Sequence, residues 1–126
     1  MKRHIPKQKL DMEAVAFLQT CDFEDIRQDV PELLEWLQDL NWWVGDGIGE
    51  YLRPYANDIK SEILAVLHTN DDQWKYGVMI CILAVTPVKL DDDYMPVLGR
   101  IMASPTPSEK EWELELLAAD IMDKQR

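Results

Sequence analysis

The sequence is poor in the residues that build disulfide frameworks, metal sites and many active sites. It has two cysteines and two histidines in 126 residues. Two thiols do not make a disulfide framework. Neither His4 nor His68 has a metal-ligand partner at helical spacing, and no H-E-x-x-H or C-x-x-C pattern occurs. We therefore expect no metal, no cofactor and no catalytic residues, and we interpret the protein as a non-enzyme.

Long apolar runs are absent too. The longest, residues 77–88, contains Thr86 and Pro87 and is too short to span a bilayer. The basic residues that begin the chain are followed by Asp11 and Glu13 rather than by an apolar stretch, which argues against a signal peptide. These features predict a cytoplasmic protein without a membrane partner.

Basic residues become scarce after position 10. The chain has 13 basic and 24 acidic residues, a formal net charge of -11, and four of the basic residues lie in residues 1–10. Residues 11–126 therefore carry a formal charge of −15. Nucleic acids need Lys and Arg against their phosphates, and anionic membrane surfaces attract basic segments. We expect neither as a partner.

Apolar residues recur at helical spacing along the whole chain and do not alternate as they do in strands. The segments with this spacing cover residues 9–20, 31–40, 43–52, 57–67, 72–86, 93–101 and 109–124. Short connections make sequence neighbours antiparallel neighbours in space. The sequence thus predicts a single all-α domain, residues 1–126, of about seven short antiparallel helices. Residues 1–8 are expected to form a mobile or extended N-terminal segment.

Potential capping residues stand in front of several of these segments. Asp71 or Asp72 can cap the helix that follows, and so can Asn57. Ser108 and Glu111 have the spacing of a capping box ahead of the last helix. These caps support the predicted helix boundaries.

A weak internal repeat favours a stack of helix pairs. The spacing of leucine and asparagine before Trp43 recurs before Trp74, at an offset of 31 residues. Periods of roughly 30–45 residues with two helices each are typical of HEAT-like arrays. The sequence favours such a stack, a right-handed α-α superhelix, over the alternative of an irregular helical bundle.

Two segments have a composition that indicates their place in the stack. The helix over 72–86 is apolar on nearly every side, so we expect it at the centre with neighbours on both sides. Gly45, Gly47 and Gly49 superficially resemble a phosphate loop, but they follow a helix and no lysine accompanies them. Their expected role is close helix packing, with Gly45 and Gly49 on one face. Residues 91–93 lack the ligand spacing of a calcium loop.

The aromatic residues supply the candidate binding surface. Adjacent Trp42 and Trp43 cannot both face one core, and the repeat aligns Trp43 with Trp74, so Trp43 is the better core candidate. The candidate partner-binding residues are Trp42, Tyr51, Tyr55, Trp74 and Trp112. Two alternatives stay open: Trp42 covers a loop, and Trp112 folds back onto the preceding helix rather than forming an exposed apolar strip.

Three segments resemble a family of short bacterial proteins, domain-of-unknown-function family 5071. They are H-I-P-K-Q-K-L-D-M-E-A-V at residues 4–15, P-E-L-L-E-W-L-Q-D-L-N-W-W-V at residues 31–44 and N-D-D-Q-W-K-Y at residues 70–76. The resemblance covers nearly the whole chain. That family is similar to HEAT-like helical arrays, so the resemblance supports the expected fold. It implies no activity and no catalytic residues.

Two functions from different classes remain. The leading hypothesis is a non-enzymatic protein–protein interaction module, because helix-pair stacks present extended binding surfaces. The alternative is an acidic immunity or inhibitor protein against a basic toxin, because a charge of −15 on residues 11–126 complements a basic partner. In both cases the expected partner is another protein.

Overall fold

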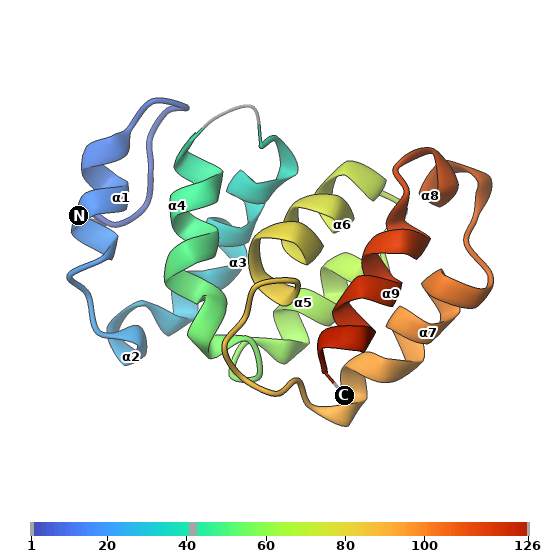
Figure 1. Cartoon of the computed structure of the whole chain (residues 1–126). Coiled ribbons are helices and arrows are strands. Elements are labelled where there is room, and N and C mark those ends of the chain that lie inside the picture. Colours follow the sequence, from blue (N-terminus) through green and yellow to red (C-terminus); the bar gives the residue numbers. More distant parts are fainter. Residues whose placement is uncertain (1, 41–42, 126) are drawn as a thin grey trace.

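The computed structural model describes residues 2–40 and 43–125, and within them it contains helices and no strand. The all-α prediction is therefore confirmed. The α-helices are α1 (Met12–Leu18), α2 (Phe23–Ile26), α3 (Val30–Leu34), α4 (Trp43–Leu52), α5 (Lys60–Leu67), α6 (Asp72–Val78), α7 (Met95–Ala103), α8 (Pro107–Glu111) and α9 (Leu114–Lys124). Figure 1 shows them in a row, with α1 at one end and α7 and α9 at the other.

Successive helices form antiparallel pairs. In Figure 1, α3 and α4 run in opposite directions, and so do α5 and α6, and α7 and α9. The two members of each pair are in contact. Three such pairs side by side fit the helix-pair stacking expected from the sequence repeat. The handedness of a superhelix stays a prediction.

The segment at 72–86 lies at the centre of the molecule, as predicted. α6 continues directly into one turn of π-helix, Met79–Leu83, and this continuous segment contacts α4, α5 and α9. Val78, Met79 and Ile82 are completely buried. Apolar residues buried against several neighbours stabilise the fold, so this segment forms part of the core.

Glycines bring α4 close to two neighbours. A Cβ atom on Gly45 would lie 2.6 Å from the carbonyl oxygen of Trp36, and one on Gly49 would lie 2.7 Å from Cβ of Cys81. Both distances are too short for a real side chain, so the predicted packing role of Gly45 and Gly49 is confirmed. The two glycines lie four residues apart on one face of α4 and meet different partners, the Glu35–Gln38 turn and the π-turn.

A third glycine sets the position of α6. A Cβ atom on Gly77 would overlap the carbonyl oxygen of Leu37, in the 3-10 turn Glu35–Gln38 that follows α3. The backbone of α6 therefore touches the backbone of this turn directly. Only a residue without a side chain permits that approach.

Asn57 does not cap α5, contrary to the prediction. The helix begins at Lys60, and its N-cap residue is Ile59, which makes no side-chain cap bond. Asn57 instead bridges two loops: its Nδ2 donates to the carbonyl oxygen of Lys89, and its Oδ1 accepts from the amide of Asp91, both at 2.8 Å. Asn57, a residue type that often caps helices, thus makes a tertiary contact instead.

The capping box lies two residues earlier than predicted. Thr106 and Glu109 form it at the start of α8, and not Ser108 and Glu111. The last helix is also interrupted, because Glu113 has a left-handed backbone conformation with φ of 56°. This residue separates α8 from α9, which the sequence pattern merges into one helix.

Residues 2–8, which the sequence predicts to be mobile or extended, contact the body of the protein through buried side chains. His4 and Ile5 are buried, and His4 Nε2 lies 2.8 Å from Oδ2 of the buried Asp29. Lys2 Nζ lies 2.6 Å from the other oxygen of the same carboxylate. Burial raises the pKa of Asp29, but the hydrogen bonds from Lys2 and His4 outweigh it and lower the pKa overall. These bonds dock the segment against the body of the protein.

The contact at Gly77 predicts that a single methyl group there weakens the fold. Gly77→Ala forces the backbones of α6 and the Glu35–Gln38 turn apart, and we expect a loss of about 1–3 kcal/mol in unfolding free energy. Gly99→Ala in α7 is the matched control, because a Cβ atom there meets nothing within 4 Å. It should stabilise the protein by about 0.5–1 kcal/mol. Urea unfolding of both variants measures the difference, and equal effects would contradict the packing role.

Candidate functional site

The five aromatic residues predicted to bind a partner do not form one surface. Trp42 lies outside the residues that the structure describes. Tyr51 and Tyr55 lie at the C-terminal end of α4 and just beyond it, Trp74 lies on α6, and Trp112 lies between α8 and α9. These aromatic residues therefore lie on separate parts of the molecule.

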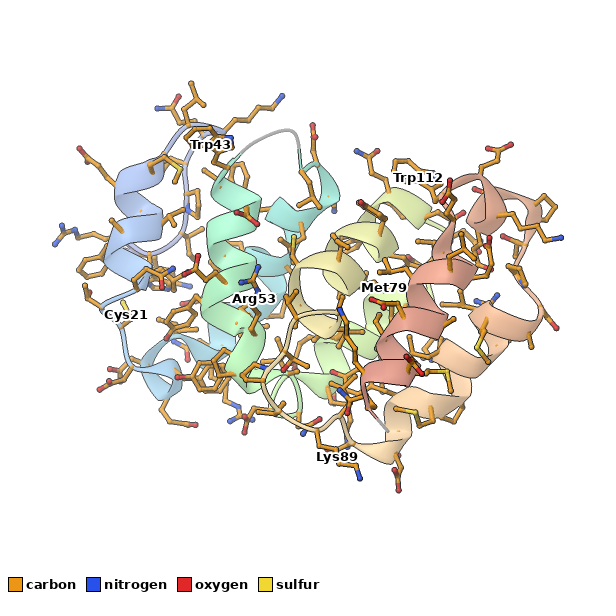
Figure 2. All side chains as sticks on the ribbon, in the orientation of Figure 1. Cys21, Trp43, Arg53, Met79, Lys89 and Trp112 are labelled. Atoms are coloured by element: carbon orange, nitrogen blue, oxygen red, sulfur yellow. The ribbon has the colours of Figure 1, made fainter. Side chains whose placement is uncertain are left out.

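Trp43 is exposed, so the prediction that it belongs to the core is wrong. It is the first residue of α4 and is 77% exposed (Figure 2). Val44 and Ile48 occupy the buried face of this helix instead. The repeat aligned Trp43 with the half-buried Trp74, but the equivalence does not extend to burial.

Tyr51 is a buried packing residue rather than part of a binding surface. It is 8% exposed, its hydroxyl donates to the carbonyl oxygen of Cys21 at 2.7 Å, and burial raises its pKa to about 12. The half-buried Tyr55 stacks on Phe23, with ring centroids 4.2 Å apart and planes 12° apart. The two tyrosines hold α2 and the preceding turn against α4, which corrects the predicted role of Tyr51.

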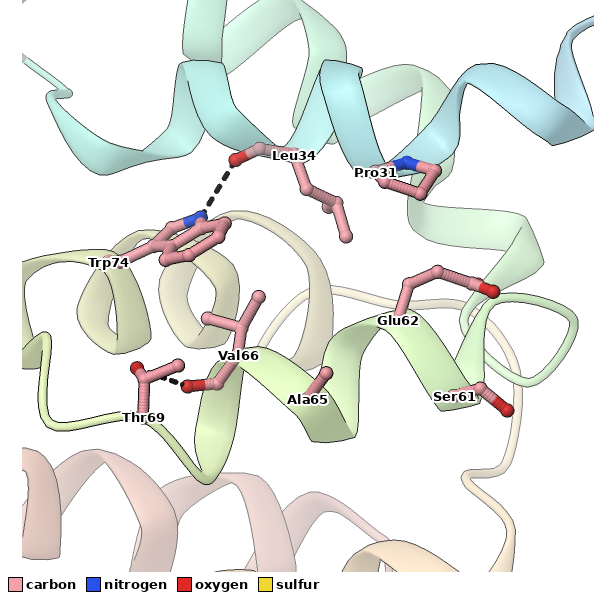
Figure 3. A pocket seen from close by; sticks show the side chains of 8 residues that line it. All are labelled: Pro31, Leu34, Ser61, Glu62, Ala65, Val66, Thr69 and Trp74. Atoms are coloured by element: carbon pink, nitrogen blue, oxygen red, sulfur yellow. Dashed lines mark hydrogen bonds between the residues drawn. The ribbon is translucent and has the colours of Figure 1, made fainter.

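An apolar groove lies between α3 and α5 (Figure 3). Its volume is about 370 Å³. The groove is lined by Pro31 and Leu34 of α3, by Ser61, Glu62, Ala65 and Val66 of α5, by Thr69, and by Trp74 of α6. Pro31 and Ala65 are exposed, whereas Leu34 and Val66 are buried. The groove thus has an apolar floor that is open to solvent between two helices.

Trp74 is held in place at one end of this groove. Its indole Nε1 donates to the carbonyl oxygen of Leu34 at 2.8 Å, as Figure 3 shows. Its backbone amide donates to Asp71 Oδ1 at 3.1 Å, which makes Asp71 the cap of α6, as predicted. A large aromatic ring with a fixed orientation and a half-buried face is a typical anchor for an apolar side chain.

The charged side chain of Glu62 lies at the other end of the groove. Of the eight lining residues only Glu62 has a formally charged side chain, and Figure 3 shows this side chain near Pro31 and away from Trp74. The hydroxyl of Thr69 is already used, since it donates to the carbonyl oxygen of Val66 at 2.7 Å. The groove is therefore suited to binding apolar side chains next to one cation.

Trp112 occupies a different surface. It is 39% exposed, and its ring lies 5.8 Å from that of Tyr76 on α6, centroid to centroid. Leu116, one turn further along, is 59% exposed. Of the two alternatives for Trp112, the structure favours the exposed strip.

A buried ionic cluster joins α6, α7 and α8, and sequence reasoning missed it. Glu109 is completely buried; Arg100 binds both of its oxygens, at 2.5 and 2.9 Å, and Lys75 Nζ lies 2.9 Å from one of them. Asp72 accepts a further contact from Lys75 at 2.7 Å. The one signal in the sequence was Arg100, a charged residue within the otherwise apolar segment of α7.

Other classes of site find no support in the described residues. Asp91 and Asp93 lie 3.2 and 2.5 Å from Lys60 Nζ, so two acids of the 91–93 segment pair with a lysine. The described part of the chain holds no cluster of three or more His, Cys, Asp or Glu residues able to bind a metal ion. Within the same residues, no helix has both the length and the apolar character needed to cross a membrane.

The ionic cluster predicts a specific loss of stability in acid. The hydrogen bonds from Arg100, followed by Lys75, lower the pKa of Glu109 to about 2 despite its burial. Because this pKa is below the unfolded value, the carboxylate stabilises the fold fully above a pH of about 4.5 and progressively less as the pH falls towards 2. We expect Glu109→Gln to cost about 2–4 kcal/mol at pH 7.

The same change should cost much less at pH 2.5, where the wild-type carboxylate has begun to protonate. Urea unfolding of both proteins at the two pH values measures the difference. The exposed Glu111 supplies the control, since Glu111→Gln should change the unfolding free energy by less than about 0.5 kcal/mol at either pH. A Glu109→Gln penalty that does not depend on pH would contradict this account.

Comparison with known proteins identifies the family. No curated protein matches the sequence. The model of one protein family matches residues 4–122, which is nearly the whole chain. That family is described as a domain of unknown function, DUF5071. The match spans the groove, the ionic cluster and the Trp112 surface, and the chain belongs to the DUF5071 family.

Proposed function

We propose that the protein is a non-enzymatic interaction module that binds an apolar segment of another protein in the α3–α5 groove. The observation that supports this proposal best is the groove itself: an open apolar channel of about 370 Å³ with a fixed tryptophan at one end. Its volume is at the lower end of the roughly 300–1,000 Å³ that ligand sites occupy. It suits a few side chains of a larger partner.

The chemistry of the groove specifies the partner further. Two helices form its walls, and an amphipathic helix laid between two helices is a common mode of peptide recognition. Glu62 places a carboxylate at the end opposite Trp74. Residues 11–126 carry a formal charge of −15, which adds a long-range attraction for cations. The occupant is therefore an amphipathic helix with apolar residues on one face and a lysine or arginine at one end.

Blocking the groove tests the proposal. Ala65 is exposed and lines the groove, so Ala65→Arg fills the channel without disturbing the core. Ala16→Arg on α1 is the matched control, because Ala16 is also exposed and the substitution adds the same charge. Helical peptides selected from a random library on the full wild-type chain serve as probes. Ala65→Arg should weaken their binding by at least about tenfold and Ala16→Arg by less than about twofold.

Two outcomes would contradict the proposal. Selected peptides that bind Ala65→Arg as tightly as wild type would place the binding surface elsewhere. A binding energy that vanishes when the salt concentration rises from 0.05 M to about 0.5 M would indicate charge alone. That second result is the one expected of an acidic inhibitor of a basic toxin, whereas burial in an apolar groove survives added salt.

A further inference from the structure

The junction of α8 and α9 forms a second pocket with a different chemistry. Its volume is about 590 Å³, and it is lined by Tyr76 of α6, by Glu111, Trp112 and Glu113 at the junction, and by Leu116 and Leu117 of α9. The left-handed residue Glu113 turns the chain here, so that the residues on either side of it border the same hollow. Aromatic, acidic and aliphatic side chains thus meet in one place.

Two aromatic rings stand in this pocket. The rings of Tyr76 and Trp112 are tilted by 42° with centroids 5.8 Å apart. Trp112 is 39% exposed and Tyr76 is partly exposed, so both leave ring surface accessible to a ligand. A tilted aromatic pair in a hollow offers π faces that attract a cation.

Two carboxylates border the same hollow and are not neutralised. Glu111 and Glu113 are exposed, and among the described residues neither forms an ion pair, in contrast to the fully paired Glu109 nearby. The pocket is therefore bordered by two carboxylates that form no ion pair among the described residues.

We propose that this pocket binds the side chain of an arginine on a partner protein. A guanidinium group stacks on aromatic faces and donates paired hydrogen bonds to carboxylates, so one side chain uses both features of the pocket. The aliphatic stem of the arginine then lies against Leu116 and Leu117. Lysine offers the charge but not the planar group, and neutral side chains do not offer the charge.

The pocket is separate from the α3–α5 groove. Trp74 and Tyr76 are two residues apart on α6, and residues at that spacing point to nearly opposite sides of a helix. The inference rests on the proposed function only in that the ligand belongs to a protein. A small probe of the pocket alone therefore separates failure of this inference from failure of the groove.

An NMR titration of the full chain with N-acetyl-arginine N-methylamide tests the inference. The signals of the Trp112 indole N–H and the Tyr76 ring should shift with a saturable dependence on the probe. N-acetyl-citrulline N-methylamide has nearly the same shape without the charge and should bind at least about tenfold more weakly. The groove variant Ala65→Arg should leave this binding unchanged.

Variants assign the binding to the pocket. The double variant Glu111→Gln/Glu113→Gln should weaken binding of the arginine probe by about tenfold. Glu13→Gln/Glu50→Gln removes the same charge from exposed positions on α1 and α4 and should weaken it by less than about twofold. Trp112→Leu, which keeps an apolar side chain against Tyr76, should also weaken binding markedly.

Three results would overturn the inference. The first is an unmoved Trp112 signal at saturating probe, and the second is equal binding of the citrulline compound. The third is an equal loss in the two double-glutamine variants, which would show that the net charge of the molecule attracts the probe without any pocket.

Discussion

The direct contact between α6 and the Glu35–Gln38 turn is the constraint on which the other features depend. Gly77 has no side chain, and its backbone rests on the carbonyl oxygen of Leu37. The same approach brings the indole of Trp74 within 2.8 Å of the Leu34 carbonyl oxygen. α6 then continues into the buried π-turn that contacts α4 and α9. One helix thus joins the first and last helix pairs, forms the end of the groove and carries Tyr76 to the second pocket.

The fold was largely predictable because helical periodicity is a local property that survives in a single sequence. The spacing of apolar residues gave the helix segments, and the all-round apolar character of 72–86 gave its central position. The type of a single residue was a weaker guide to its role where tertiary contacts compete for the same side chain. Asn57 has the right type for a cap, yet it bridges two loops. Trp43 fits the repeat, yet it begins its helix on the solvent side.

The candidate site was only partly predictable. Trp74 and Trp112 were found because aromatic residues stand out in composition, and each lines a pocket. Their partners could not be found in that way. Pro31 and Ala65 are unremarkable in sequence and meet only when α3 packs beside α5. The buried pairing of Glu109 with Lys75 and Arg100 depends on three helices and leaves no local pattern. Contacts between common residue types that lie far apart in the chain leave no recognisable pattern in a single sequence.

We propose that the groove ending at Trp74 is the binding surface of the protein. Its most direct test is the set of tryptophan indole N–H signals in the ¹⁵N-labelled full chain, recorded with and without a groove-selected peptide. We expect the Trp74 indole signal to shift on binding, while its proton exchanges slowly because the Leu34 carbonyl oxygen accepts its hydrogen bond. The Trp112 signal should stay in place. Peptide binding that moves Trp112 or another indole and leaves Trp74 unmoved would contradict the claim.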